Sequence, residues 1–297
     1  RGVESMLAEE IAVIPGMEEG ASLLWVNQHY LDAKYDVIIV DCAPTAETLR
    51  LLSLPDVGRW WFDRLFPIGR RATLALAPIA RPLLDNMPLP DRATFKATED
   101  LFAELDKIHQ LLSDSRISSM RLVVNPEKMV IKEAQRTYTS LNLYSYVTDV
   151  VVCNRVMPDT AQGSYFEAWL TSQRKYLQMV EEAFAPLPIM TAPYFEQEVA
   201  GIPMLKRLAA ALFGERDPAQ IFFEGQAYRI EKSADGYVLA VPLPFVDKED
   251  VLLLRKESEL TLQVGARRRT FALPRVLAGR ETRGAGFVEH ELRIRFG

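Results

Sequence analysis

The sequence predicts an α/β fold with a doubly wound, mainly parallel sheet, followed by a small C-terminal antiparallel β-sandwich. Three short runs rich in β-branched residues, 37–41, 121–125 and 150–154, suit strands that are buried on both faces. Helical patterns separate these runs, and strands alternating with helices favour a doubly wound sheet. Towards the end of the chain the pattern changes to short alternating strands. We therefore expect an α/β domain over residues 1–222 and a β domain over residues 226–297.

Four segments carry the pattern of helices. In the second of them Leu101, Leu105, Ile108 and Leu112 fall on one helical stripe. Pro126 stands where the first turn of the third helix tolerates a proline. The predicted helices span residues 5–34 (interrupted near Pro15), 96–112, 127–141 and 164–184.

The predicted β domain opens with a hairpin. Residues 228–234 and 237–242 flank Asp235-Gly236, a dipeptide that favours a tight turn with positive φ at both positions. Further alternating strands are expected over residues 259–264, 268–273 and 291–296.

Composition narrows the class of protein. The 297 residues are 48% hydrophobic and 25% charged, enough to fill a core, and the net charge of −5 argues against a nucleic-acid partner. Only Cys42 and Cys153 are present, which excludes a disulfide framework and fits a reducing compartment such as the cytoplasm. No apolar run reaches the roughly 18 residues of a membrane span. Because the sequence opens at Arg1 without a methionine, we expect the start of the protein to lie upstream.

The run 37–41 ends on Asp41, at the edge of the predicted sheet where α/β proteins bind ligands. An acid in this place can hold Mg²⁺ through water, as the acid of a Walker B strand does. Pro44 stiffens the following loop, and Thr45 could cap the helix after it. The alternative is a core strand whose terminal Asp41 caps a turn.

The segment 41–50, DCAPTAETLR, resembles the switch II motif of the ArsA-type ATPases, which comprise arsenite-pump and tail-anchored-protein-targeting ATPases. Residues 124–128 resemble the family's strand followed by Pro-Glu, and residues 151–155 resemble the strand end whose Asn faces adenine. Residues 192–195 resemble the loop that closes over the base. The resemblance covers residues 1 to about 214 and implies a P-loop NTPase fold.

The resemblance also implies roles for individual residues. Asp41 would serve Mg²⁺, and Pro44 and Thr45 would belong to the loop that senses the γ-phosphate. The adenine would be held by Asn154, Arg155, Pro193 and Tyr194. ATP and Mg²⁺ are the implied cofactors, and a homodimer that opens and closes with hydrolysis is the implied assembly. From spacing alone, Asn154 could equally satisfy loop backbone and Tyr194 could be a surface aromatic.

The sequence departs from the family in several places. Glu47 stands where the targeting members often carry His. Ala46 replaces the glycine that follows the switch II Thr, which narrows the freedom of that loop. The family's Walker A loop is not in the sequence, so the first strand and the P-loop would lie upstream of Arg1 and the sheet would be incomplete at its N-terminal side. Without the backbone donors and lysine of that loop, we expect the polypeptide as written not to hydrolyse ATP, although its parent would be an ATP hydrolase.

An apolar segment with interleaved arginines, residues 59–87, is a candidate client groove within a helical region over residues 59–112. In the targeting members the client groove falls in this part of the chain. The alternatives are amphipathic helices that close the core or form a dimer interface. The groove residues would be Trp60, Trp61, Phe62, Leu65 and Phe66.

Three purposes compete for the ATPase cycle. The first is targeting of a hydrophobic helix or tail-anchored client, with a membrane-associated partner. The second is an arsenite or anion pump, which needs several thiolates together, whereas only Cys42 and Cys153 exist. The third is a non-enzymatic, chaperone-like binding module. We expect no zinc, because the zinc-bridging CxxC of targeting members is lacking and the three histidines are scattered.

The β tail resembles the α-crystallin domain appended to some ArsA-type ATPases of bacteria and plastids. The expected location is the cytoplasm, with the plastid stroma as the alternative if the source is a plant or alga. Such a domain either binds clients and partners through its sheet edges or stabilises the dimer as an accessory. Arg267-Arg268-Arg269 is predicted to be a solvated strand end.

Overall fold

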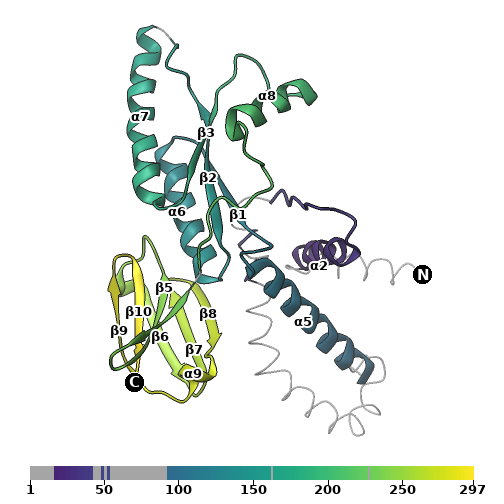
Figure 1. Ribbon diagram of the computed structural model, residues 1–297, viewed down its shortest axis with the longest axis vertical. Helices are drawn as coiled ribbons and strands as arrows, with labels where there is room; N and C mark the ends of the chain where they lie inside the picture. Colours follow the sequence, from purple (N-terminus) through teal and green to yellow (C-terminus); the bar gives the residue numbers. More distant parts are fainter. Residues whose placement is uncertain (1–16, 43–47, 50–51, 54–91, 162, 227) are drawn as a thin grey trace, which may run out of the picture. The chain divides into compact units, whose positions relative to one another are not determined.

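The computed structural model describes residues 17–42, 48–49, 52–53, 92–161, 163–226 and 228–297 (Figure 1). The predicted loop residues Pro44 and Thr45 and the candidate groove residues 60–66 lie outside the described residues. The chain divides into two compact units, Arg1–Leu111 and Leu112–Gly297.

The first unit contains the helices α2 (Met17–Asp32) and α5 (Arg92–Ser113). α5 lies close to the predicted span 96–112, and α2 is the described part of the helix predicted over 5–34, whose residues 5–16 lie outside the described residues. Leu23, Leu105 and Ile108 are buried, and the Asn27 amide donates to the Glu104 carboxylate at 3.2 Å. The apolar stripe of α5 therefore packs as predicted over its middle, although Leu101 is exposed.

The prediction of a buried strand over residues 37–41 is wrong for the structure as described. These residues form an irregular segment, and Ile39 is 89% exposed. A strand exists only through hydrogen bonds to a neighbour, and the described residues supply no neighbouring strand for this segment. The β-branched composition of the segment favours an extended backbone, but a strand also needs a neighbouring strand to pair with.

The second unit begins with a parallel sheet of order β1-β2-β3, which confirms the predicted α/β class. Helices follow each strand, as a doubly wound fold requires (Figure 1). The elements are β1 (Met120–Val124), α6 (Lys128–Leu143), β2 (Thr148–Val156), α7 (Ser164–Phe184), β3 (Ile189–Pro193) and α8 (Gly201–Phe213).

Two local predictions in this sheet need correction. β1 was expected to be buried on both faces, but Leu122 and Val124 are buried while Val123 is 63% exposed. β1 is an edge strand of the described sheet, and α6 packs on one of its faces. Pro126 precedes the N-cap Glu127 instead of occupying the first turn of α6.

Among the described helices, none is long and apolar enough to cross a membrane.

The C-terminal part is the predicted antiparallel sandwich, coloured green to yellow in Figure 1. One sheet has the order β4-β5-β10-β9 and the other the order β6-β7-β8. The one-turn helices η1 (Lys248–Asp250) and α9 (Arg275–Ala278) lie in the connections. The strands are β4 (Arg229–Ser233), β5 (Gly236–Pro242), β6 (Val251–Lys256), β7 (Glu259–Val264), β8 (Arg267–Ala272), β9 (Thr282–Val288) and β10 (Glu291–Phe296).

The hairpin is present, but its turn lies one residue earlier than predicted. Ser233 pairs with Gly236, so Ala234 and Asp235 form the two-residue loop. Of Ala234, Asp235 and Gly236, only Gly236 has a positive φ, 141°. A Cβ at this position would lie 2.0 Å from the carbonyl oxygen of Phe296. The glycine is therefore required by the close approach of the C-terminal strand end as well as by its backbone conformation.

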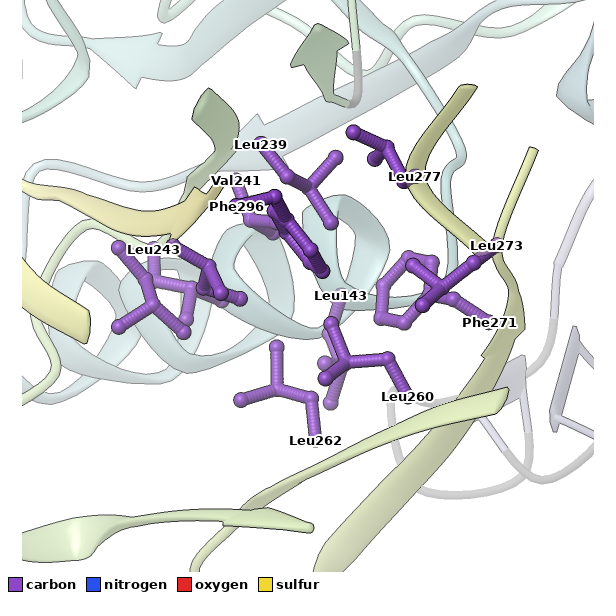
Figure 2. Close-up of a cluster of buried hydrophobic side chains, with 12 residues drawn as sticks. Leu143, Leu239, Val241, Leu243, Leu260, Leu262, Phe271, Leu273, Leu277 and Phe296 are labelled. Atoms are coloured by element: carbon purple, nitrogen blue, oxygen red, sulfur yellow. The ribbon is translucent and has the colours of Figure 1, made fainter. Parts of the chain in front are cut away.

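The core of the sandwich includes a residue from the α/β part of the chain. Leu143, at the end of α6, is fully buried among side chains of both sheets, as Figure 2 shows. The side chains gathered around it are Leu239, Val241, Leu243, Leu260, Leu262, Phe271, Leu273, Leu277, Leu292, Ile294 and Phe296. The β domain is therefore docked on α6 and shares its core with it.

Polar contacts reinforce this docking and overturn one prediction. Arg269, expected on a solvated strand end, is only 7% exposed and donates from Nη1 to the Leu143 carbonyl and to Ser145 Oγ, each at 2.6 Å. Thr139 Oγ1 donates to the Pro244 carbonyl at 2.6 Å. Because strand neighbours point to opposite faces, Arg268 is exposed while Arg269 turns inward.

Candidate functional site

The carboxyl ends of the three parallel strands meet at one edge of the sheet. The register pairs Val124 of β1 with Cys153 of β2, and Cys153 with Thr191 of β3. The residues that follow, including Asn125, Asn154 and Pro193, therefore gather at the same edge. In open α/β sheets this edge is the usual place for a ligand.

A β-bulge shapes this edge at Asn154 and Arg155. Cys153 pairs with Thr191 while Val156 pairs with Pro193, so β2 carries one extra residue between these two pairs. Arg155 takes a positive φ of 54° at the bulge, and its backbone N–H donates to Asn154 Oδ1 at 3.0 Å. The bulge thus uses one lone pair of the Asn154 amide oxygen. The half-buried side chain keeps a second lone pair, and no hydrogen bond from its NH₂ group to another described residue is found.

The end of β3, with the predicted adenine residues Pro193 and Tyr194, is joined directly to this bulge. The Tyr194 backbone N–H donates to the carbonyl of Val156 at 2.7 Å, which continues the ladder one residue past β3. Tyr194 is 58% exposed, and its neighbour Pro193 is half-buried. The structure therefore brings together the four residues predicted to hold adenine: Asn154, Arg155, Pro193 and Tyr194.

The loop after β2 is fixed to α7. The Gln173 amide accepts from the Met157 backbone N–H at 2.7 Å and donates to the Met157 carbonyl at 2.9 Å. Arg174, one residue further, pairs with Asp159 at 3.1 Å. These contacts fix the loop that follows the bulge to α7, which restricts the movement of the backbone next to Asn154.

The loop after β3 is fixed to α8 in a similar way. Glu196 and Arg207 form an ion pair at 2.5 Å, and the Arg207 guanidinium lies 5.0 Å from the centre of the Phe195 ring. The hydrogen bond from Arg207 lowers the pKa of the Glu196 carboxyl. Gln197 Nε2 also lies 3.0 Å from the sulfur of Met204, which is buried. The segment beyond Tyr194 is therefore attached to a helix at several points.

Asn125 was not among the predicted site residues, although it lies at the same edge. It directly follows Val124, and its carbonyl accepts from the Glu127 backbone N–H at 2.7 Å as the chain turns into α6. The parallel order of β1 and β2 could have indicated it, because neighbouring strands of a parallel sheet deliver their next residues to one place.

Asp41 and Cys42 belong to the first unit, whereas the sheet edge belongs to the second. Both are exposed, and the Cys42 thiol lies 3.7 Å from the Val40 carbonyl. An exposed carboxylate suits Mg²⁺, which usually takes one or two carboxylates together with substrate phosphates and water. Among the described residues no group of three or more His, Cys, Asp or Glu side chains is arranged to hold a metal ion by itself.

Cys153 lies within β2, next to Asn154, but is sealed from solvent. Its side chain has no exposed area, and burial raises the pKa of its thiol to about 11. The thiol is therefore neutral near physiological pH and is a poor nucleophile or soft-metal ligand there.

This raised pKa predicts a loss of stability at alkaline pH. The folded state favours the neutral thiol, so its contribution is complete below the unfolded pKa near 9 and is lost as the pH rises towards 11. Between pH 8.5 and 10.5 we expect the free energy of unfolding to fall by about 2 kcal/mol more in the wild type than in Cys153→Ala. Urea titrations of both proteins at the two pH values measure the difference. Parallel losses in both proteins would contradict a buried, neutral thiol.

Comparison with known proteins agrees with the two-part fold. The family model described as anion-transporting ATPase, ArsA_ATPase, matches residues 1–214. The chain belongs to this family. A second model, the HSP20-like domain found in ArsA, matches residues 234–296 and thus most of the sandwich. The predicted family and the predicted crystallin-like domain are both confirmed.

Two relatives of this ArsA-family chain match almost its whole length, and a third matches part of it. A protein of Aquifex aeolicus that carries the name of an arsenical pump-driving ATPase is 36% identical over 99% of this chain and 75% of its own length. One of Chlorobaculum tepidum with a similar name is 33% identical over the whole chain and 74% of its own length. The ATPase GET3B of Arabidopsis thaliana is 28% identical over 65% of this chain and 48% of its own length.

Proposed function

We propose that the full-length protein binds ATP with Mg²⁺ and couples hydrolysis to the opening and closing of a homodimer that handles a hydrophobic client. The observation that carries the proposal is the bulged edge of the sheet. Asn154, Pro193 and Tyr194 lie together there, on backbone that hydrogen bonds hold in place. Membership of an ATPase family supports a nucleotide as the ligand of this edge.

The chemistry of the gathered residues suits an adenine. The Asn154 amide offers a donor and a remaining lone pair, which match the mixed donor and acceptor edge of the base. The exposed ring of Tyr194 and the ring of Pro193 offer apolar surface for packing against its plane. Mg²⁺ would neutralise charge on the phosphates, and Asp41 is the residue we assign to it, with Pro44 and Thr45 sensing the γ-phosphate.

A hydrophobic client fits the chain better than a metalloid does. Arsenite binding calls for several soft thiolates together, but the chain has two cysteines and one of them is buried with a pKa of about 11. The apolar segment around Trp60 and Phe66 is the assigned client groove.

Replacing Asn154 with alanine tests the nucleotide site. We expect the Kd for ATP with Mg²⁺ to rise about tenfold in the full-length protein, since a lost hydrogen bond to a buried partner costs about 1.4 kcal/mol. Calorimetry measures this change. Inorganic tripolyphosphate is the control ligand, because it has no base and its affinity should stay the same. Equal affinity of variant and wild type for ATP would contradict the assignment.

The client is tested separately with a fluorescent apolar helical peptide. We expect its affinity for the full-length protein to change on addition of ATP and Mg²⁺, and Asp41→Asn to abolish that change. A peptide affinity that is the same with and without ATP and Mg²⁺ would instead favour a chaperone-like module whose ATPase part is structural.

A further inference from the structure

β6 is an edge strand with an unusual outer face. It stands at one end of the sheet β6-β7-β8, and among the described residues its backbone ladder runs to β7 alone. Val251 and Leu253 pack against the core, whereas Leu252 and Leu254 point outward and are 49% and 54% exposed. An open edge strand presents unpaired backbone N–H and C=O groups, and the outward leucines add a hydrophobic surface beside them.

The opposite edge of the same sheet shows the usual protection. β8 begins with three arginines, of which Arg268 is exposed. In the other sheet the edge strand β4 reads Arg-Ile-Glu-Lys-Ser and is charged as well. Charged side chains on an edge discourage pairing with another chain, so β6 differs from both of these edges.

We propose that β6 pairs in antiparallel fashion with β6 of a second copy of this chain, around a two-fold axis at Leu253. The proposal concerns the β domain and does not depend on the nucleotide site. It joins two three-stranded sheets into one sheet of six strands.

The register follows from which face each side chain occupies. A two-fold axis perpendicular to the sheet keeps the outer faces of both copies on one side, and directly opposed residues then share a face. Centring the axis on Leu253 sets Leu252 opposite the partner's Leu254, so that the four exposed leucines form one apolar patch. Cross-strand apolar pairs of this kind stabilise a sheet.

The charges at the two ends of β6 favour the same register. Asp250 precedes the strand and extends its ladder, since its carbonyl accepts from the Gly265 N–H at 3.1 Å. Asp250 and Lys256 lie an even number of residues from Leu252 and therefore on the same face of the strand, and both are exposed. The register centred on Leu253 sets Asp250 opposite the partner's Lys256 at both ends. A shift of the axis by one residue in either direction would set a leucine opposite a charge instead.

The first test is the mass of the full-length protein by sedimentation equilibrium. We expect Leu254→Glu to halve the mass of the largest assembly, because it places acids inside the leucine patch. A homodimer formed through the α/β domain would survive this change, giving two chains where the wild type has four. Val288→Glu is the matched control, since Val288 is an exposed apolar residue on the edge strand β9 and its replacement should leave the mass unchanged.

The second test is a charge exchange. We expect Lys256→Glu to raise the Kd of this association about tenfold, and the double change Asp250→Lys with Lys256→Glu to return it to within about threefold of the wild type. The proposal is overturned if Leu254→Glu leaves the mass unchanged, which would favour an extended segment of another protein at this edge. It is also overturned if the exchange fails to restore association.

Discussion

Arg269→Ala should lower the free energy of unfolding of the second unit by about 3–4 kcal/mol. Arg269 is 7% exposed, and its guanidinium donates to the Leu143 carbonyl and to Ser145 Oγ at 2.6 Å. Hydrogen bonds from a charged donor contribute about 1.5–3 kcal/mol each, and their loss leaves buried oxygens without that donor. The cation also lies at the carboxyl end of α6, where the helix dipole favours positive charge.

The adjacent arginine provides the control for this result. Arg268 is on the opposite, exposed face of β8, so Arg268→Ala should change stability by no more than about 0.5 kcal/mol. Urea denaturation followed by far-ultraviolet circular dichroism measures both variants, and limited proteolysis between α8 and β4 reports release of the β domain. Equal, small effects of the two substitutions would show that Arg269 does not hold the domain in place.

Arg121→Ala is the second substitution with a large expected effect, about 2–4 kcal/mol. Asp149, in β2, has no exposed side-chain area, and its carboxylate lies 3.5 Å from Arg121 Nε and accepts the Phe222 N–H at 3.2 Å. Arg121 also donates to the Pro218 and Gln220 carbonyls at 2.8 and 3.0 Å. Removing it would leave a buried carboxylate without its cation and release the linker that leads to the β domain.

A second variant separates the charge from the packing. Adding Asp149→Asn to Arg121→Ala removes the unpaired charge, so the double variant should regain part of the loss. Arg116 and Asp114 form a shorter pair, at 2.6 Å, but Arg116 is 85% exposed. Arg116→Ala should therefore have little effect on the free energy of unfolding, because solvent screens an exposed pair. A loss at Arg116 as large as that at Arg121 would show that burial is not the deciding factor.

These two clusters connect the candidate site to the HSP20-like domain. α6 begins at Lys128, just after the sheet edge that carries Asn125, and ends under Arg269 and in the core of the sandwich. The linker that follows α8 is held by Arg121 and Asp149. The β domain is thus attached both through its linker and through a shared core, which favours an integral part of the ATPase over a freely tethered module.

Much of the fold could be predicted from local pattern. The helix over 164–184 is found at its predicted bounds, the strands at 121–125 and 150–154 are present, and β10 matches its predicted span. Periodicity reports which residues prefer to be buried together, and that preference acts over a few neighbours in the chain. The motif resemblance predicted four residues to hold adenine, and the parallel sheet brings these four together.

The remaining features depend on partners distant in the sequence. The bulge at Asn154 arises because β2 must match β3, and the requirement for Gly236 arises because Phe296 lies against it. The burial of Arg269, the place of Leu143 in the sandwich core and the pairing of Arg121 with Asp149 are also decided by contacts between distant segments. The sequence by itself determined the family, the α/β and β classes and most element spans, because these depend on local composition and motif. Only the tertiary structure decided which polar groups are buried, because the free energy of a buried charge or carbonyl depends on the partner that folding brings to it.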